Sequence, residues 1–486
     1  MTANTLLRDD LSGDLNDDLS LKNIESANLQ AEILPAGGLD SDRFDWQEVW
    51  YPVFYTEDLD KTKPAKFTLL ERDLVIWWDR NTNEWKAFDD RCPHRLVPLS
   101  EGRIAEDGLL ECPYHGWAFK GDGSCDRIPQ QPEGGTAHTS KRACVTSLPT
   151  AERQGLLFIY AGKTENASQI KIPIIEPLDT DTEKWTLFGT FRDLPYDALT
   201  LLENVLDASH LPFTHHKSVG NRVNAAPMVL ELLESGKNGF NGTWEEGPRR
   251  GKLGRQDTKF IAPSLMWHDL TSKQFGRTIT AVYATPTRKG ECRLFARFPF
   301  QFSSAIPRFF IGITPRWYSH IGQNGILEDD QIFLHYQERY LEQALAKSEG
   351  RANYAKSFYL ATPADTYVSE LHKWVNRYKA DPFAGQRLAA PLAKEVLLDR
   401  YHSHTSKCAS CSQALRNVRR IKTASIVIAA IAWTASPLIS FFFAPANLTV
   451  ILLSSIPTAI AIALWLICNN LERKFIYGQE TPLRNL

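Results

Sequence analysis

The sequence predicts a multidomain α+β protein that ends in a helical hairpin, and three observations lead to this prediction. The chain has 486 residues, which favours two folded domains with accessory segments. Short strand-like segments separated by turns fill residues 67–160, a pattern typical of an antiparallel β domain. Residues 423–471 include no Asp, Glu, Lys or Arg, and this stretch is long enough for two apolar helices.

The composition is that of a chain that folds largely in water. Hydrophobic residues make up 43% and charged residues 23%, which excludes a wholly disordered chain and a polytopic membrane protein. The formal net charge of −2 excludes a nucleic-acid binder that works by neutralising phosphates. Eight cysteines are too few for a secreted disulfide scaffold, so we expect a reducing compartment.

These features divide the chain into six predicted segments. In order they are an acidic disordered tail (1–43), a β domain with a metal-binding motif (44–165), a larger catalytic domain (166–400), a linker with a Cys-x-x-Cys motif (401–422), the apolar hairpin (423–471) and a short cytoplasmic tail (472–486). The first 18 residues of this tail carry five aspartates that repel one another and bury nothing. It has the features of neither a secretory signal nor a transit peptide.

The uncharged stretch predicts a transmembrane hairpin. Its two apolar segments, 424–443 and 448–468, each approach the length of about 20 residues that a spanning helix needs. Basic residues precede the first segment and follow the second, whereas the connecting turn is uncharged. Both chain ends are therefore expected on the cytoplasmic side. The alternative is a helical hairpin buried in a soluble core.

Two loops of the β region carry matching pairs of metal ligands. Residues 92–94 read Cys-Pro-His and residues 112–115 read Cys-Pro-Tyr-His. A 2Fe-2S cluster with mixed ligation needs two thiolates on one iron and two imidazoles on the other. Cys92 and Cys112 would hold the first iron, and His94 and His115 the second. By ligand count, a structural zinc site is the alternative.

A second candidate metal site lies further along the chain. Asp207, His210 and His215 follow the pattern Asp-x2-His-x4-His. Asp207 and His210 are expected on one helix face, and Pro212 should end that helix so that His215 can approach. Two histidines and a later carboxylate form the facial triad of non-haem iron(II), which leaves positions open for dioxygen and substrate. The acidic segment at residues 327–332 offers the third ligand.

A Cys-x-x-Cys motif formed by Cys408 and Cys411 lies shortly before the apolar hairpin. The spacing allows three interpretations. The pair could be a reversible dithiol, a metal site completed by His402 and His404, or two ordinary thiols.

The motifs resemble those of a known family. The segments DRCPHRLVPLSEGRI and CPYHGWAFKGDGSCDRIPQ resemble the cluster loops of Rieske proteins, and CPHR with YHGW resembles Rieske-type oxygenases. The segments PAD at 363–365, HKW at 372–374 and DRYHSH at 399–404, followed by the Cys-x-x-Cys motif and a hairpin, resemble the pheophorbide a oxygenase family. This resemblance covers about residues 46–470, including the cluster, iron and Cys-x-x-Cys motifs.

The resemblance implies a structure and roles for particular residues. It implies a Rieske domain with a 2Fe-2S cluster and a helix-grip catalytic domain with mononuclear iron(II). Asp330 becomes the preferred third iron ligand because of its spacing to Gln337, with Asp329 as the alternative. Asp207 would bridge an iron-binding histidine and a cluster histidine of a neighbouring subunit, which implies a homotrimer, and Asn204 would lie beside this site. The Cys-x-x-Cys pair would be a thioredoxin-reducible switch.

The resemblance also implies a function. The chain would be a membrane-bound oxygenase that uses dioxygen and reduced ferredoxin to oxidise a chlorophyll-type tetrapyrrole, namely chlorophyllide a, protochlorophyllide a or pheophorbide a. A separate electron donor is expected because the chain has no Gly-x-Gly-x-x-Gly motif for binding NAD(P)H. The missing transit peptide suggests a bacterial, cyanobacterial origin. The alternatives are a non-catalytic membrane redox carrier or sensor and an oxygenase of another hydrophobic substrate.

Overall fold

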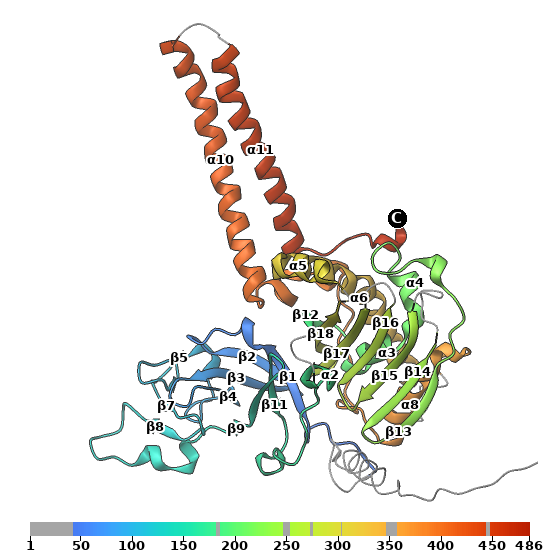
Figure 1. Cartoon of the computed structure of the whole chain (residues 1–486). Helices are drawn as coiled ribbons and strands as arrows, with labels where there is room; N and C mark the ends of the chain where they lie inside the picture. The colour runs from blue at the N-terminus through green and yellow to red at the C-terminus, as the bar shows by residue number, and fades with distance from the viewer. Residues whose placement is uncertain are drawn as a thin grey trace, which may run out of the picture.

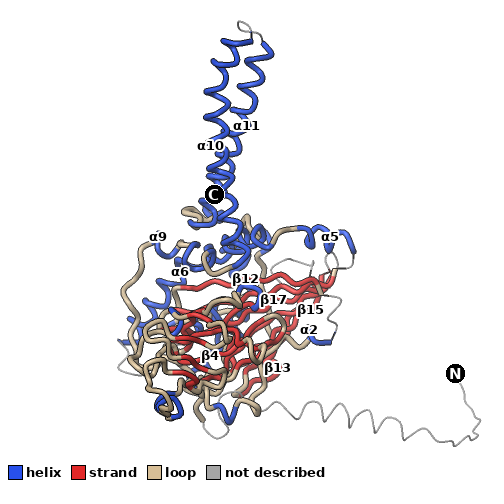
Figure 2. Tube along the Cα trace, turned by 90° about the vertical axis from the view of Figure 1, so that its left-hand side faces the viewer, coloured by secondary structure: helices blue, strands red, loops and turns tan. Residues whose placement is uncertain are grey.

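The computed structural model describes residues 42–180, 185–245, 253–272, 276–302, 304–346, 357–443 and 448–486. Nearly all of the predicted acidic tail and the turn at 444–447 lie outside this part of the chain. The described residues form a body of two β-rich parts from which a pair of long helices projects (Figure 1). Figure 2 shows the hairpin leaving the body at the end opposite to β13 (Glu231–Gly236).

The N-terminal part consists of small antiparallel sheets, as predicted. Their strand orders are β1-β11-β10, β2-β3-β4-β9 and β5-β6-β7-β8. The strands are β1 (Trp50–Tyr55), β2 (Ala65–Leu69), β3 (Arg72–Asp79), β4 (Glu84–Asp89), β5 (Arg103–Ile104), β6 (Leu110–Glu111), β7 (Ala118–Phe119), β8 (Cys125–Arg127), β9 (Ser147–Leu148), β10 (Thr150–Arg153) and β11 (Leu156–Tyr160). Val75, Trp77 and Phe88 pack in one core with Cys92 and Cys112, so the sheets position the cysteine-bearing loops.

The second part is built on a seven-stranded antiparallel sheet of order β12-β18-β17-β16-β15-β14-β13. Its other strands are β12 (Thr186–Leu194), β14 (Gly239–Trp244), β15 (Leu253–Ile261), β16 (Leu265–Ser272), β17 (Gly276–Arg288) and β18 (Glu291–Gln301). The helices of this part are α2 (Pro177–Thr180), α3 (Ala198–Leu206), α4 (Leu211–Thr214), α5 (Ala305–Ile313), α6 (Arg316–Ala346), α8 (Thr366–Arg377) and α9 (Lys394–Leu397). Helix α3 packs on β16, β17 and β18, and α6 contacts the edge strand β12.

The hairpin consists of α10 (Ala409–Phe443) and α11 (Leu448–Ile476), which pack side by side (Figure 1). Polar contacts close its base, because Lys422 Nζ donates to Asn469 Oδ1 at 2.7 Å and pairs with Glu472 at 2.9 Å. Within the described residues, one segment, Ser455–Ile476, is long and apolar enough to cross a membrane. The sequence predicted two membrane-spanning helices, and the described residues contain one that meets these criteria.

The segment predicted as a linker, 401–422, is folded. Residues Tyr401–Thr405 form a π-helical turn and α10 starts at Ala409, well before the apolar stretch. Leu415 and Val418 of α10 lie in the same core cluster as Leu265 and Phe295 of the large sheet. The first turns of α10 thus belong to the body, because their apolar side chains are buried there.

A buried carboxylate connects α6 with three distant parts of the chain. Glu328 accepts hydrogen bonds from Arg192 Nη1 at 2.7 Å, Arg400 Nη2 at 2.7 Å and the Gln479 backbone N–H at 3.1 Å. The side chains of Glu328 and Arg192 are 2% and 0% exposed. Burial of charged groups is tolerated only when they are paired and hydrogen-bonded. Glu328 therefore fixes α6 against β12, the chain before α10 and the chain after α11.

We expect Glu328→Gln to destabilise the body strongly. The substitution keeps the shape of the side chain but leaves two buried guanidinium groups without a counter-charge, at a cost of about 3–5 kcal/mol. The thermal unfolding midpoint of the full chain in mild detergent would report the loss. Glu84→Gln is the matched control, because Glu84 is 63% exposed in its pair with Lys86 and exposed pairs contribute about 0–1 kcal/mol. Equal shifts for both variants would contradict this account.

Candidate metal centres

The two cysteine and histidine loops meet at the edge of the N-terminal part, as the motif predicted. Cys92 and Cys112 are 1% and 2% exposed. The backbone N–H of Gly116 donates to the Cys112 carbonyl at 3.1 Å, which closes the second loop into a tight turn. The rings of His94 and His115 lie with centroids 4.5 Å apart and are half-buried, so the cysteines point inward and the histidines face the rim.

The side chains of these loops fit a 2Fe-2S cluster. Within the described structure, His94 Nδ1 is buried and has no hydrogen-bond partner, a costly state for a polar atom unless it binds a metal. The ring of His94 stacks on Trp117 with centroids 4.7 Å apart, which holds its orientation. A hydrogen bond between the two cysteines lowers the pKa of Cys112 and raises the pKa of Cys92, so Cys112 is the thiol that loses its proton first.

The second motif folds differently from the prediction around Asp207. Helix α3 ends at Leu206, and Asp207 caps a 3-10 turn, Ala208–His210, by accepting from the Ser209 backbone N–H at 2.7 Å. Pro212 lies in the first turn of α4. The prediction that Asp207 and His210 share an α-helical face that Pro212 ends is thus wrong. A short side chain such as Asp favours capping over a place inside a helix, and proline suits a first turn.

The predicted iron ligands nevertheless converge. The ligand atoms of His210, His215 and Asp330 all lie within 4.8 Å of one another. His215 Nε2 is 3.3 Å from Asp330 Oδ2, and the two imidazole centroids are 5.3 Å apart. His210 and His215 come from the turns after α3, whereas Asp330 comes from the middle of α6. Two imidazoles and one carboxylate around a common point match the donor set of a facial triad.

Hydrogen bonds orient both imidazole rings toward this point. His210 Nδ1 bonds to the backbone carbonyl of Asp207, and His215 Nδ1 lies 3.2 Å from Asp329 Oδ2. These contacts leave the Nε2 atom of each ring available, which is the arrangement that orients metal-binding histidines in proteins. The Asp207 carboxylate lies 3.9 Å from His210 Nδ1, and Asn204 Nδ2 donates to Asp330 Oδ1 at 3.4 Å.

The two adjacent aspartates of α6 face opposite nitrogens of His215. Asp329 lies on the Nδ1 side and Asp330 on the Nε2 side, where the three predicted ligands meet. Burial lowers the pKa of His215, but the two carboxylates outweigh burial and raise it to about 9. The surroundings of this buried imidazole therefore favour positive charge, which suits a metal cation.

No pattern in the sequence indicates that the C-terminal tail returns to this centre. Arg484 donates to the backbone carbonyl of Asp329 and lies 3.8 Å from its carboxylate. Arg222, a few residues beyond His215, donates to the Arg484 carbonyl at 2.6 Å. A separation of 155 residues between Arg484 and Asp329 leaves no local signal for this contact.

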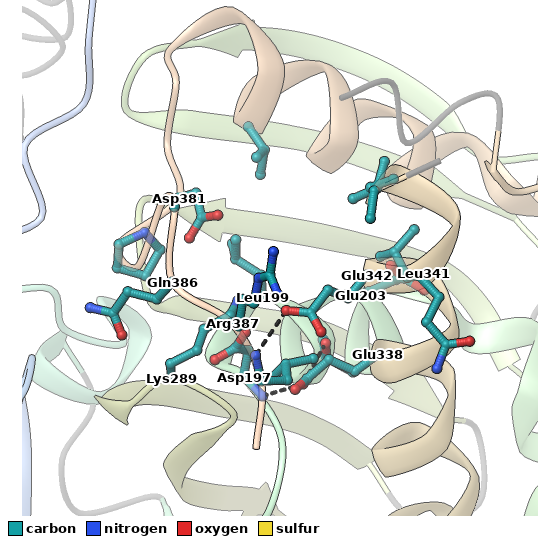
Figure 3. Close-up of a pocket in the computed structure, with 18 of the residues that line it drawn as sticks. Asp197, Leu199, Glu203, Lys289, Glu338, Leu341, Glu342, Asp381, Gln386 and Arg387 are labelled. Carbon is teal, nitrogen blue, oxygen red and sulfur yellow. Dashed lines mark hydrogen bonds and ion pairs between the residues drawn. The ribbon is translucent and has the colours of Figure 1, made fainter. Parts of the chain in front are cut away.

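A pocket of about 510 Å³ lies between α3, α6 and α8, and the predicted iron ligands do not line it. Figure 3 shows its charged lining, in which Lys289 pairs with Asp197 at 2.6 Å. Burial and the nearby Asp197 raise the pKa of Glu338 to about 7.

The Cys-x-x-Cys pair lies at the base of the hairpin. Cys408 and Cys411 are 0% and 1% exposed and lie beside His404 and His320. His402, which the sequence offered as a metal ligand, is 79% exposed at its side chain and pairs with Asp399. That expectation was wrong because the π-helical turn directs neighbouring histidines to different sides.

Comparisons with known proteins agree with these centres. Residues 49–149 match the family model of the Rieske 2Fe-2S domain, and residues 260–348 match that of pheophorbide a oxygenase. The chain is 38% identical to the chloroplastic pheophorbide a oxygenase of Arabidopsis thaliana, over 82% of this chain and 77% of that protein. The chain belongs to the pheophorbide a oxygenase family. As a member of this family, it is a Rieske non-haem iron oxygenase with a 2Fe-2S cluster and a mononuclear iron site, which excludes zinc in the N-terminal loops.

Two further similarities show how broad the family and fold are. The chain is 34% identical to the chloroplastic flavonoid 8-hydroxylase 2 of Ocimum basilicum, over 81% of this chain and 78% of that protein. The crystal structure of dicamba monooxygenase bound to dicamba superposes with a TM-score of 0.56 at 20% identity, covering 68% of this chain and 96% of that one, and supports the fold. The two relatives are chloroplast proteins, so they give no support to the bacterial origin expected from the sequence.

We expect Asp330→Asn and Asp329→Asn to differ in their effect on mononuclear iron. Asp330→Asn removes the carboxylate at the meeting point of the three side chains and should abolish iron binding there. Asp329→Asn alters only the orientation of His215, which typically weakens metal affinity by about 10–100-fold. Iron content after dialysis against a series of chelator concentrations would measure both effects, with the optical spectrum of the cluster as a check on folding.

Asp257→Asn is the control, because Asp257 is 59% exposed on β15. A larger loss of iron in the Asp329 variant than in the Asp330 variant would reverse the two roles.

Proposed function

We propose that this chain uses electrons from reduced ferredoxin to insert one atom of dioxygen into a chlorophyll-type tetrapyrrole, such as pheophorbide a, chlorophyllide a or protochlorophyllide a. The observation that carries the proposal is the convergence of His210, His215 and Asp330 in a chain that is 38% identical to a pheophorbide a oxygenase. The second atom of dioxygen leaves as water. Formation of this water consumes two electrons and two protons.

In this proposal Cys92 and Cys112 would hold one iron of the cluster, and His94 and His115 the other. Replacement of two thiolates by neutral imidazoles raises the reduction potential above that of an all-cysteine ferredoxin. The half-buried histidines form the exit for electrons, because the cysteines lie in the core and the histidines at the rim.

His210, His215 and Asp330 would hold the mononuclear iron, which supplies dioxygen activation when bound. Asp329 orients His215 through Nδ1, and Asn204 steadies Asp330 through its amide at 3.4 Å. The large sheet would complete a helix-grip arrangement around α3 and cover the iron on the substrate side. In this role the sheet would exclude water from the reacting centre.

We place the electron path between subunits of a homotrimer. Figure 1 shows β5–β8, which bear the cluster loops, and α4 on opposite sides of one chain. Apolar side chains are exposed near both centres, with Leu96 69% and Tyr114 57% exposed beside the cluster and Phe213 55% exposed beside the iron ligands. Head-to-tail packing would cover these side chains. Asp207, which is 27% exposed at its side chain, would then connect a cluster histidine of one subunit to His210 of the next.

The hairpin would anchor the body to a bilayer through both of its helices. The apolar side chains of Ile428, Ile431 and Trp433 on α10 are 52%, 60% and 73% exposed. Within the described residues, however, the length and composition of a spanning helix are met by Ser455–Ile476 alone. Arg419 and Lys422 pair with Glu472 at the base, where the two helices enter the body. The excess of basic residues at this end favours the cytoplasmic side, or its topological equivalent, for the catalytic part.

The similarity to a flavonoid hydroxylase supports a second candidate substrate class, a smaller planar aromatic molecule. Both substrate classes would react at the same iron centre. The shape of the substrate pocket, and not the chemistry of the iron ligands, would therefore decide which class is accepted.

We expect purified chain in mild detergent, supplied with reduced ferredoxin and ¹⁸O-labelled dioxygen, to label a tetrapyrrole. The panel would include the three tetrapyrroles named above and a flavone, and product mass would report incorporation of one labelled atom. Asp330→Asn, with its cluster shown to be intact, is the negative control. Label in the flavone alone would transfer the function to the second class, and label in neither would refute both.

We expect Asp207→Asn to break the electron path while both metal centres stay loaded. In a single turnover with the cluster reduced beforehand, reoxidation by dioxygen and substrate should slow by at least about tenfold, since an orienting carboxylate is lost. Reoxidation at the same rate as in the unmodified chain would contradict the bridge. Sedimentation of both proteins in detergent would show whether the assembly is a trimer.

A further inference from the structure

We propose that His320, His404, Cys408 and Cys411 form a tetrahedral site for one zinc ion, which fixes the base of the hairpin to helix α6. Helix α6 supplies one of the four side chains, and a segment more than 80 residues later supplies the other three. His320 lies in the second turn of α6, His404 in the π-helical turn, Cys408 just before α10 and Cys411 in the first turn of α10. Their exposed fractions are 0%, 1%, 0% and 1% in that order.

The distances between the ligand atoms suit a single ion. His320 Nδ1 lies 3.0 Å from His404 Nε2 and 3.5 Å from the Sγ atoms of both cysteines. Cys411 Sγ lies 3.4 Å from His404 Nε2. Zinc bonds of about 2.0–2.1 Å to nitrogen and about 2.3 Å to sulfur in a tetrahedron give ligand separations of about 3.3–3.6 Å for these pairs. A two-iron cluster would hold the two pairs of ligands further apart.

The rings of His320 and His404 each donate one N–H to a backbone carbonyl, and their unprotonated nitrogens face each other. His320 Nε2 lies 2.9 Å from the Gly189 carbonyl and His404 Nδ1 lies 2.7 Å from the Phe191 carbonyl. A carbonyl only accepts, so these nitrogens carry the hydrogens, and a neutral ring has no second hydrogen. The facing lone pairs repel at 3.0 Å unless a proton or a metal ion lies between them.

A metal ion accounts for this contact better than a proton does. Thiol hydrogens are weak donors and would not explain why the two nitrogens approach so closely. Metal-binding histidines commonly donate their other N–H to a backbone carbonyl, as both rings do here. Four protein ligands leave no open position, which indicates a structural ion and not a catalytic one.

The neighbouring charges show what the ion would hold together. Asp58 of the N-terminal part accepts from the Ala409 backbone N–H at 2.9 Å, where α10 begins, and pairs with Arg316 at 2.7 Å, where α6 begins. His320 follows on the same helix, and Asp330 lies further along it. An ion at this point would therefore fix the two β-rich parts, the hairpin and the helix that carries an iron ligand.

The first test is the metal content of the full chain, purified in mild detergent without added zinc or chelator. We expect about one zinc ion per chain besides the iron, as the closed four-ligand site requires. His320→Gln and Cys411→Ser should lower zinc at least about tenfold. The controls His402→Gln and Cys144→Ser change an exposed histidine and an exposed cysteine and should keep it.

The second test uses the unmodified chain and so does not depend on the folding of variants. Cobalt(II) added after chelation of zinc, to chain whose 2Fe-2S cluster is shown to be intact, should give a thiolate-to-cobalt charge-transfer band. The predicted mononuclear iron site cannot give this band because it has no sulfur ligand. Chelation should also make Cys408 and Cys411 reactive toward a maleimide. A chain that holds no zinc and gives no such band, or one with a Cys408–Cys411 disulfide in its peptide map, would overturn the proposal. The disulfide would favour the thioredoxin-reducible switch.

Discussion

The structure depends on a buried polar face of α6. Residues of this helix with little exposure include His320, Asn324, Glu328, Asp329 and Asp330, whereas an ordinary amphipathic helix buries apolar side chains. Each of these five residues has a specific partner, such as Arg192 for both Asn324 and Glu328. Apolar contacts allow a helix to slide at little cost, but a paired buried charge does not, because a shift would leave it without a partner. The helix is thereby fixed along its axis.

This fixed position matters for chemistry because α6 supplies one side of the iron centre while the turns after α3 supply the other. His210 and His215 are anchored by short local contacts, including the Asp207 cap and the bond from Ser218 Oγ to the His215 carbonyl at 2.8 Å. Asp330 meets them only if α6 has the correct register. One residue of rotation would move it by about 100° around the axis and replace it by a neighbour. Asp329, one residue earlier, indeed faces the opposite nitrogen of His215.

The sequence predicts contacts between residues that are close in sequence, and it does not predict contacts between residues that are far apart in sequence. The predicted ligands of the cluster lie on two neighbouring loops of one small domain, so their spacing alone indicated that they meet. Spacing also indicated that His210 and His215 meet, and resemblance selected Asp330 as the third member of this group. The roles of Arg484, Glu328 and His320 could not be predicted, because each depends on a partner that is 72 or more residues away. The polar face of α6 also lacks the apolar periodicity by which helices are recognised.

The errors have a common physical origin. The segment before the hairpin has a composition typical of a linker, and only its burial against the large sheet shows that α10 begins inside the body. The sequence offers His402 and His404 equally as ligands beside the Cys-x-x-Cys motif. In the structure the side chain of His402 is exposed, whereas His404 is 1% exposed and lies beside His320. In both cases tertiary packing decides between options that are locally equal. The same packing gives the Cys-x-x-Cys motif its meaning, because two cysteines need two further ligands to hold an ion and α6 brings one of them.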